Sequence, residues 1–214
     1  MMMFPTGDAM ISQLNEQMRR IVISGTIREE TAALFLEQIT AFEYLDISKP
    51  ISVYIDTFGG CVDAALLMYD TMKSCCMPVV TIGIGKVMSA GTLLLAAGEK
   101  GNRFITENCR VMIHQVSGAV MGNMTEMQNS IEETRRLQDI YIEILAKETG
   151  VPESKILKDI QSGDFYMDAP AAIEYGLADQ LVPMRKEKVP GTLDLAPKPK
   201  KIIKKAKKTV KKGK

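Results

Sequence analysis

The sequence predicts an α/β protein built on a largely parallel sheet. Runs rich in β-branched and aliphatic residues alternate with stretches whose apolar residues recur every three to four positions, which is the helical spacing. Strands that are separated by helices in this way pair in parallel through right-handed crossovers. At 214 residues the chain is long enough for one domain with a sizeable core.

The first half of the chain contains three expected strands. Residues 1–18 form a Met-rich lead of weak pattern, with a short helix expected from Ser12. The strands are expected over 19–25, over 50–55 and from Val79 to just before Ser89. The helices are expected over 29–45 and 62–72, and a sharp turn over 56–60. The residues expected to face the core are Ala32, Ala33, Leu36, Ile39 and Phe42 in the first helix and Ala65, Leu66 and Tyr69 in the second.

The second half of the chain is expected to contain a strand, an arm and a long helix. The strand is Arg110–His114, the arm 115–123 is irregular and extended, and the helix runs from Thr125 to about Glu148. Gly150 ends that helix, whose apolar positions exceed one narrow stripe, so it is predicted to project or to contact another subunit. Thr125 and Gln128 suit a capping box. Shorter elements follow: a helix over 152–161, an extended piece over 164–167, a helix over 169–175 ended by Gly176, and a strand at 181–182.

The charge of the chain is divided between an acidic body and a basic tail. Residues 186–214 hold 12 lysines against two acidic residues, a net charge of +10, and the remainder carries −9. Proline and glycine precede the lysine run, so 186–214 is expected to be a disordered tail. Such a tail would bind nucleic acid through phosphates, without sequence selectivity. A solvated tail is the favoured interpretation, because charge runs are commonly solvated.

Composition points to a cytoplasmic protein. No apolar run is long enough to span a bilayer, so no membrane contact is expected, and the start lacks the basic region and apolar core of a secretory signal. The four cysteines form neither a metal-binding spacing nor a pattern typical of a disulfide framework.

Ser89 lies where a buried strand gives way to a short buried helix that ends at Gly98. The amides at a helix start favour negative charge, which suits a nucleophile and its oxyanion. Serine is also among the preferred N-caps, and this stretch alone favours the cap. The nucleophile-elbow pattern is incomplete as well, because Val87 stands where its first glycine would be.

Two further features lie at strand ends near Ser89 in the predicted sheet. The pair Gly59-Gly60 would let backbone N–H groups approach a ligand closely, although the pair taken by itself favours a plain tight turn. His114 is the only histidine, so it must be the base if a histidine activates Ser89. Carboxyl ends of parallel strands form the binding crevice of such sheets.

Four short motifs in a fixed order resemble the proteolytic subunit family of the Clp protease. They are Gly59-Gly60, Met88-Ser89-Ala90-Gly91, Met112-Ile113-His114-Gln115 and Glu174-Tyr175-Gly176-Leu177-Ala178-Asp179. The resemblance runs from about Arg19 to Met184. It implies a crotonase/ClpP-like α/β fold of repeated β-β-α units with a projecting handle helix, and it places the peptidase domain at 19–185, after the N-terminal lead 1–18.

The resemblance also implies a serine endopeptidase that needs no metal or other cofactor. Its triad would be Ser89, His114 and Asp164, with Asp168 as the competitor for the acid. The oxyanion would be held by the backbone N–H groups of Gly60 and Ala90. The residues expected to bind substrate are Gly59, Gln115 and Val116.

The family's assembly implies a homo-oligomer of two stacked seven-membered rings that degrades unfolded proteins. The arm and the long helix would join the rings, and a hexameric ATP-driven unfoldase would deliver substrates. The chain has no phosphate-loop motif, so ATP would be used only by that partner. Thr57-Phe58 in place of the usual Ser-Pro, Val116 in place of proline, and the short lead depart from the family pattern.

Three alternatives share parts of this pattern. A capsid-maturation or signal-peptide peptidase of related fold would suit the basic tail, but the His-Gln and Glu-Tyr-Gly-Leu motifs favour the first interpretation. A crotonase-type acyl-CoA enzyme would share paired oxyanion amides but would not need a serine and a histidine at these strand ends. A silent ring subunit would not need a complete triad.

Overall fold

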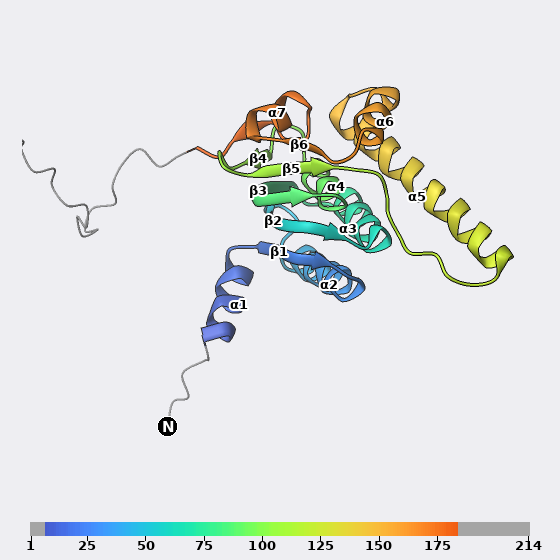
Figure 1. Cartoon of the computed structure of the whole chain (residues 1–214). Coiled ribbons are helices and arrows are strands. Elements are labelled where there is room, and N and C mark those ends of the chain that lie inside the picture. The colour runs from blue at the N-terminus through green and yellow to red at the C-terminus, as the bar shows by residue number, and fades with distance from the viewer. Residues whose placement is uncertain (1–6, 184–214) are drawn as a thin grey trace, which may run out of the picture. The chain divides into compact units, whose positions relative to one another are not determined.

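A sheet of seven strands carries the fold (Figure 1). The computed structural model of the chain describes residues 7–183. The strands β1 (Arg20–Ile27), β2 (Ile51–Gly60), β3 (Val79–Met88), β4 (Arg103–Ile105) and β7 (Gln180–Leu181) lie side by side in this order, all parallel. Strand β5 (Arg110–Ile113) is parallel to β3, and β6 (Phe165–Met167) is antiparallel to β5. The α/β class with a mainly parallel sheet is confirmed.

Strand β3 changes partner along its length. Its first half pairs with β4 and its last residues pair with β5, and between them the register to β2 shifts from Ile55 opposite Gly83 to Thr57 opposite Val87. Gly85 lies in this bulge with φ +61°, a conformation that glycine adopts without steric cost. The bulge directs the end of β3 toward β5, so Ser89 and His114 follow neighbouring strands.

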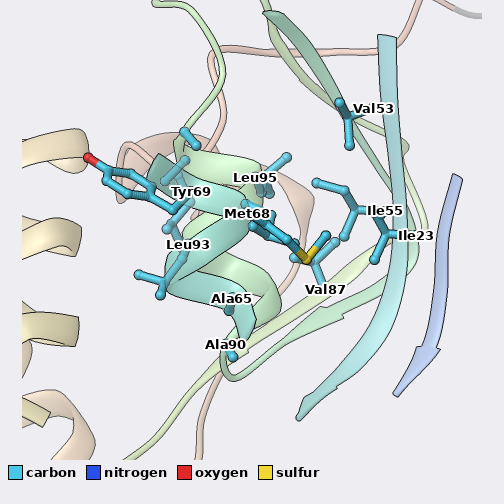
Figure 2. Close-up of a cluster of buried hydrophobic side chains, with 14 of the residues drawn as sticks. Ile23, Val53, Ile55, Ala65, Met68, Tyr69, Val87, Ala90, Leu93 and Leu95 are labelled. Carbon is cyan, nitrogen blue, oxygen red and sulfur yellow. The ribbon is translucent and has the colours of Figure 1, made fainter. Parts of the chain in front are cut away.

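The core lies between the sheet and helices α3 (Val62–Ser74) and α4 (Gly91–Ala96), while α2 (Glu29–Leu45) packs beside α3 and β1. Alternate residues of β2 are fully buried, as expected for a strand with one face on the core. Figure 2 shows Met68 of α3 pointing toward Ile55 and Val87 of the strands. All six residues of α4 are buried, which agrees with the predicted buried helix before Gly98.

Helix α5 (Met124–Thr149) runs away from the sheet, and the arm before it connects β5 to its far end (Figure 1). The arm 115–121 has no regular secondary structure, as predicted. Gly150 ends α5 in the left-handed conformation, with φ +80°. Three short elements complete the fold: α1 (Gly7–Gln17), α6 (Glu153–Gln161) and α7 (Ala169–Glu174).

Two sequence-based predictions about local structure were wrong. The sharp turn expected over 56–60 is the continuation of β2, because these residues keep pairing with β1 across a register shift at Gly25. The capping box of α5 is formed by Asn123 and Glu126, two residues before the predicted pair. Asparagine is a better helix N-cap than threonine, so α5 is capped by Asn123 and not by Thr125.

Smaller differences concern helix faces and element starts. Helix α1 begins at Gly7, ahead of the expected Ser12, and β4 was not predicted at all. In α2 the buried residues are Ala32, Phe35, Ile39 and Phe42, whereas Ala33 and Leu36, which were also predicted to face the core, are exposed. Phe35 occupies the core position between Ala32 and Ile39, and this turns its neighbour Leu36 outward. The predicted basic tail lies outside the described residues.

Candidate active site

Ser89 lies in a strained turn between β3 and α4. Its φ is +52°, and it is one of two non-glycine residues with positive φ among residues 7–183. Left-handed backbone is uncommon for a residue with a side chain and costs of the order of 1–3 kcal/mol, so the surrounding structure must hold it. The amide of Ser89 donates a hydrogen bond of 2.8 Å to the carbonyl of Met112 on β5.

The carbonyl of Ser89 is held from the other side by Thr92 and Tyr141. Thr92 donates to this oxygen from its amide at 2.9 Å and from its Oγ1 at 2.7 Å, and the Tyr141 hydroxyl lies 3.4 Å from it. Tyr141 is buried on α5, and its hydroxyl lies 2.9 Å from Thr92 Oγ1. Burial raises the pKa of Tyr141, so the hydroxyl keeps its proton and remains a donor.

Gly59 makes room for this turn. A Cβ at Gly59 would lie 2.6 Å from Ser89 Cβ and 2.8 Å from the Met88 carbonyl oxygen, and its φ is +94°. Thr57, fully buried, accepts a hydrogen bond from the Gly59 amide at 2.9 Å and donates to the Gly25 carbonyl. The end of β2 therefore approaches Ser89 as closely as two backbones permit.

The side chain of Ser89 is directed at His114. The Oγ lies 2.7 Å from His114 Nε2, within hydrogen-bonding distance. The cap position of α4 is occupied by Ala90, so the N-cap interpretation of Ser89 is wrong. A serine hydroxyl bonded to an imidazole nitrogen is the arrangement that activates a serine nucleophile.

Asp164 lies on the other side of the imidazole, at a longer distance. Its Oδ1 is 3.7 Å from His114 Nδ1, and its side chain is 49% exposed. The Tyr166 hydroxyl donates to its Oδ2 at 3.3 Å. Asp168 instead caps α7 by accepting a hydrogen bond of 2.9 Å from the Ala171 amide. The geometry therefore favours Asp164 over Asp168 as the partner of the imidazole.

A cleft of about 210 Å³ lies over the serine and the histidine. Gly60 and Ala90, the predicted oxyanion donors, both line it, and so does Val116. The Ala90 amide nitrogen is 3.1 Å from the position of a Cβ on Gly59, so this amide and the end of β2 lie close together. Of the predicted substrate-binding residues, Gly59 lies under Ser89, and Gln115 is exposed beside the cleft residues His114 and Val116.

Comparison with known proteins places this chain in a family. A sequence profile of the Clp protease family, described as "Clp protease", matches residues 6–185. The chain belongs to the Clp protease family. Relatives named ATP-dependent Clp protease proteolytic subunit include one from Deinococcus radiodurans, 36% identical over 78% of this chain and 82% of that protein. Another, from Dehalococcoides mccartyi, is 38% identical over 77% of this chain and 82% of that protein. Subunit 2 from Treponema pallidum is 36% identical over 84% of this chain and 90% of that protein.

Membership of the Clp protease family makes this chain a serine-type peptidase, a hydrolase, and confirms the resemblance and the fold predicted from it. Within residues 7–183, no three His, Cys, Asp or Glu side chains gather as metal ligands would. Over the same range, no helix combines the length and apolar character needed to cross a membrane.

Sequence reasoning missed Thr92 and Tyr141 as residues that hold the Ser89 turn of this Clp protease family member. Thr92 lies three positions after Ser89, where a side chain reaches back to a carbonyl at the start of a helix, and this spacing was a usable signal. No pattern in the sequence pointed to Tyr141, because its contact with Thr92 depends on how α5 packs against α4. The motif residue Asp179 has a structural partner: it pairs with the buried Arg103 through a 2.5 Å ion pair.

Proposed function

We propose that this chain is the proteolytic subunit of an ATP-dependent protease and hydrolyses peptide bonds of unfolded proteins. The observation that carries the proposal is the 2.7 Å contact between Ser89 Oγ and His114 Nε2 at a strained turn. Membership of the Clp protease family supports it, since the relatives matched are named ATP-dependent Clp protease proteolytic subunits.

The proposed reaction begins with attack of Ser89 Oγ on a peptide carbonyl. His114 takes the serine proton at Nε2 and passes it to the leaving amine, which departs with the C-terminal product. Water then attacks the acyl-serine ester with His114 again as the base, and the N-terminal product leaves as a carboxylic acid. Asp164 would hold the proton on Nδ1 of His114 and stabilise the imidazolium.

Two backbone N–H groups would bind the oxyanion that forms at each attack. These are the amides of Gly60 and Ala90, two residues that line the same cleft as Ser89. Donors in fixed positions stabilise charge that develops only in the transition state, and removing one such donor typically costs about 100- to 1,000-fold in rate. The Ala90 amide follows Ser89 directly in the chain, so the left-handed backbone of Ser89, φ +52°, sets the positions of both the Oγ and this amide.

The proposed working form is a homo-oligomeric double ring fed by an ATP-driven unfoldase. Apolar side chains are exposed along the arm and the first half of α5: Val120, Met121, Met124, Met127 and Ile131. Met124, Met127 and Ile131 recur at helical spacing along α5, and contact with another subunit would cover such an exposed apolar face. A closed chamber would limit substrates by access, so the cleft itself would tolerate many sequences. The peptidase domain would be 19–185.

Labelling with a fluorophosphonate probe tests the proposal. The probe should modify Ser89 in the full-length protein, as mapped by mass spectrometry, and Ser89→Ala and His114→Ala should abolish labelling. Ser117→Ala is the matched control, because Ser117 lines the same cleft without a histidine partner in the structure. Absence of labelling in a preparation that sedimentation shows to be assembled would reject an active serine peptidase and favour a silent subunit.

A further inference from the structure

Asp164 lies beside His114 because of the way two strands pair. In the antiparallel register of β5 and β6, Ile113 lies opposite Phe165. His114 follows Ile113 in the chain and Asp164 precedes Phe165, so the register brings the carboxylate to the imidazole. The position of Asp164 therefore depends on Phe165, the next residue along the chain.

Phe165 is held by side chains from two helices. Its ring centroid lies 5.8 Å from that of Tyr175 at the end of α7, and the two ring planes are inclined by 44°. Lys155 Nζ, from α6, lies 5.9 Å from the centroid of the Phe165 ring and 5.2 Å from that of the Tyr175 ring. Tilted aromatic pairs and cations over ring faces both stabilise such packing. A shift of Phe165 would break both contacts.

Asp159 of α6 fixes the other two members of this cluster. Its Oδ2 accepts a hydrogen bond of 2.9 Å from the Tyr175 hydroxyl and pairs with Lys155 Nζ at 2.7 Å. The Asp159 side chain is only 14% exposed, and Tyr175 is buried. Burial and the nearby Asp159 carboxylate raise the pKa of Tyr175, so its hydroxyl keeps the proton that it donates. We call Lys155, Asp159, Phe165 and Tyr175 the aromatic anchor.

Tyr175 belongs to the Glu-Tyr-Gly-Leu motif, for which the proposed reaction has no role. The next residue, Gly176, has φ +85°, and a Cβ there would lie 2.5 Å from the carbonyl oxygen of Thr149, the last residue of α5. The glycine therefore lets the end of α7 pack closely against α5. Tyr175, directly before it, meets Phe165 from this fixed position.

We propose that Tyr175 and Phe165 are positioning residues that set the distance between Asp164 and His114. This inference rests on the proposed peptidase function and deepens it, since it names residues that act through the acid of the same site. The Asp164 side chain is 49% exposed and receives one side-chain hydrogen bond within residues 7–183, from Tyr166. The aromatic anchor instead holds the backbone from which this carboxylate extends.

Peptide hydrolysis by the assembled full-length protein tests the aromatic anchor. Tyr175→Phe removes the hydrogen bond to Asp159 and keeps the ring, and it should lower kcat about two- to fivefold. Phe165→Ala removes the ring and should lower kcat about five- to twentyfold, because the carboxylate is no longer held near the imidazole. KM should stay within about twofold, since neither side chain lines the cleft over Ser89.

A double-mutant cycle separates a positioning role from a general loss of stability. In the Asp164→Asn background, Tyr175→Phe and Phe165→Ala should each lower kcat by less than about twofold, because the carboxylate through which they act is already gone. Tyr44→Phe is the matched control and should keep full kcat, because that tyrosine is 92% exposed on α2. Losses that multiply with the loss of Asp164→Asn, or full kcat in both single variants, would overturn the inference.

A second measurement reads the geometry without catalysis. His114 is the only histidine of the chain, so protein made with isotope-labelled histidine gives one imidazole signal by nuclear magnetic resonance. Asp164→Asn should shift this signal, and Tyr175→Phe should shift it less in the same direction. If the wild-type chain neither reacts with the fluorophosphonate probe nor cleaves peptides, the proposed function fails. The positioning role is then upheld only if Tyr175→Phe shifts the signal in the wild-type background and not in Asp164→Asn, and it is rejected otherwise.

Discussion

The two sides of His114 differ in how firmly the fold holds them. On the serine side, Nε2 lies 2.7 Å from an Oγ whose backbone is held by hydrogen bonds from β5 and α4. On the aspartate side, Nδ1 lies 3.7 Å from a half-exposed carboxylate in the connection between α6 and β6. Ser89, the proposed nucleophile, is held by core elements, whereas Asp164, the proposed acid, lies at the surface.

This difference indicates that a single chain by itself fixes the serine side of the site and leaves the aspartate side loosely held. The turn at Ser89 is fixed by residues from β2, β5, α4 and α5, all in the same core. Asp164 follows Gly163, whose φ is +116°, and its one hydrogen bond from a side chain comes from Tyr166, two residues away. A distance of 3.7 Å exceeds a hydrogen bond, so Asp164 must move closer to bond with the imidazole. We expect variants on the two sides to behave differently.

Outside the proposed triad, the largest expected effect comes from Gly59→Ala. The added Cβ would collide with Ser89 Cβ and the Met88 carbonyl and would move the nucleophile. A displacement near 1 Å can cost about 100-fold, so the rate of fluorophosphonate labelling should fall at least this far. Gly118→Ala is the control, because a Cβ there meets nothing within 4 Å. Normal labelling of Gly59→Ala would mean that the serine turn is less constrained than the contacts imply.

Asp164→Asn tests the aspartate side of His114, which the fold holds loosely. Asparagine cannot stabilise an imidazolium, but this carboxylate is half exposed and distant, so kcat should fall only about 10- to 100-fold, well below the roughly 10⁴-fold known for a buried triad aspartate. Peptide hydrolysis by the assembled protein measures this. Asp168→Asn should keep full activity, since that side chain caps α7. A loss of 10⁴-fold in Asp164→Asn would show that the acid closes fully on the histidine in the working enzyme.

Thr92→Val and Tyr141→Phe remove the hydroxyls behind Ser89. Each hydrogen bond contributes about 1 kcal/mol, so each variant should lower kcat roughly three- to tenfold while KM stays unchanged. Thr92→Ser keeps the hydroxyl and should restore most of the rate. Full kcat in Thr92→Val, which keeps the methyl group, together with a loss in Thr92→Ser would contradict a role for the hydroxyl and point to the methyl group.

Glu148→Gln, on the buried half of α5, should have the smallest effect on activity of these variants. Its effect on stability should be measurable. Burial opposes ionisation of Glu148, but hydrogen bonds from Tyr69 at 2.7 Å and Lys73 at 3.0 Å lower its pKa below the usual range. Such a group stabilises the fold fully above the ordinary glutamate pKa near 4.3 and loses this contribution as the pH falls below it. Figure 2 shows the Tyr69 hydroxyl on the side away from the strands.

Thermal unfolding between pH 7 and pH 3.5 measures the contribution of Glu148. At pH 7 the variant should be less stable by roughly 1–3 kcal/mol, because Tyr69 and Lys73 lose their charged partner. The wild-type protein should then lose stability more steeply than Glu148→Gln as the pH falls. Parallel curves would show that the carboxylate is not linked to folding.

The sequence allowed Ser89 and His114 to be predicted, but not the residues that hold Ser89 in place. Ser89 and His114 end strands whose apolar patterns are clear, and parallel pairing brings strand ends together. Tyr141 could not be predicted, since its contact with Thr92 joins residues 49 positions apart through helix packing. The end of β2 looked like a turn because glycines weaken strands, but pairing with β1 overrides that local preference.

The exposed methionines of the arm and α5 have a chemical consequence. Met121 and Met124 are 91% and 80% exposed, whereas Met68 and Met88 are buried. Dilute peroxide converts accessible thioethers to sulfoxides, so the first two should oxidise early in a free chain and slowly wherever another molecule covers them. Because a sulfoxide is polar, oxidative stress would also weaken any apolar contact that depends on this surface.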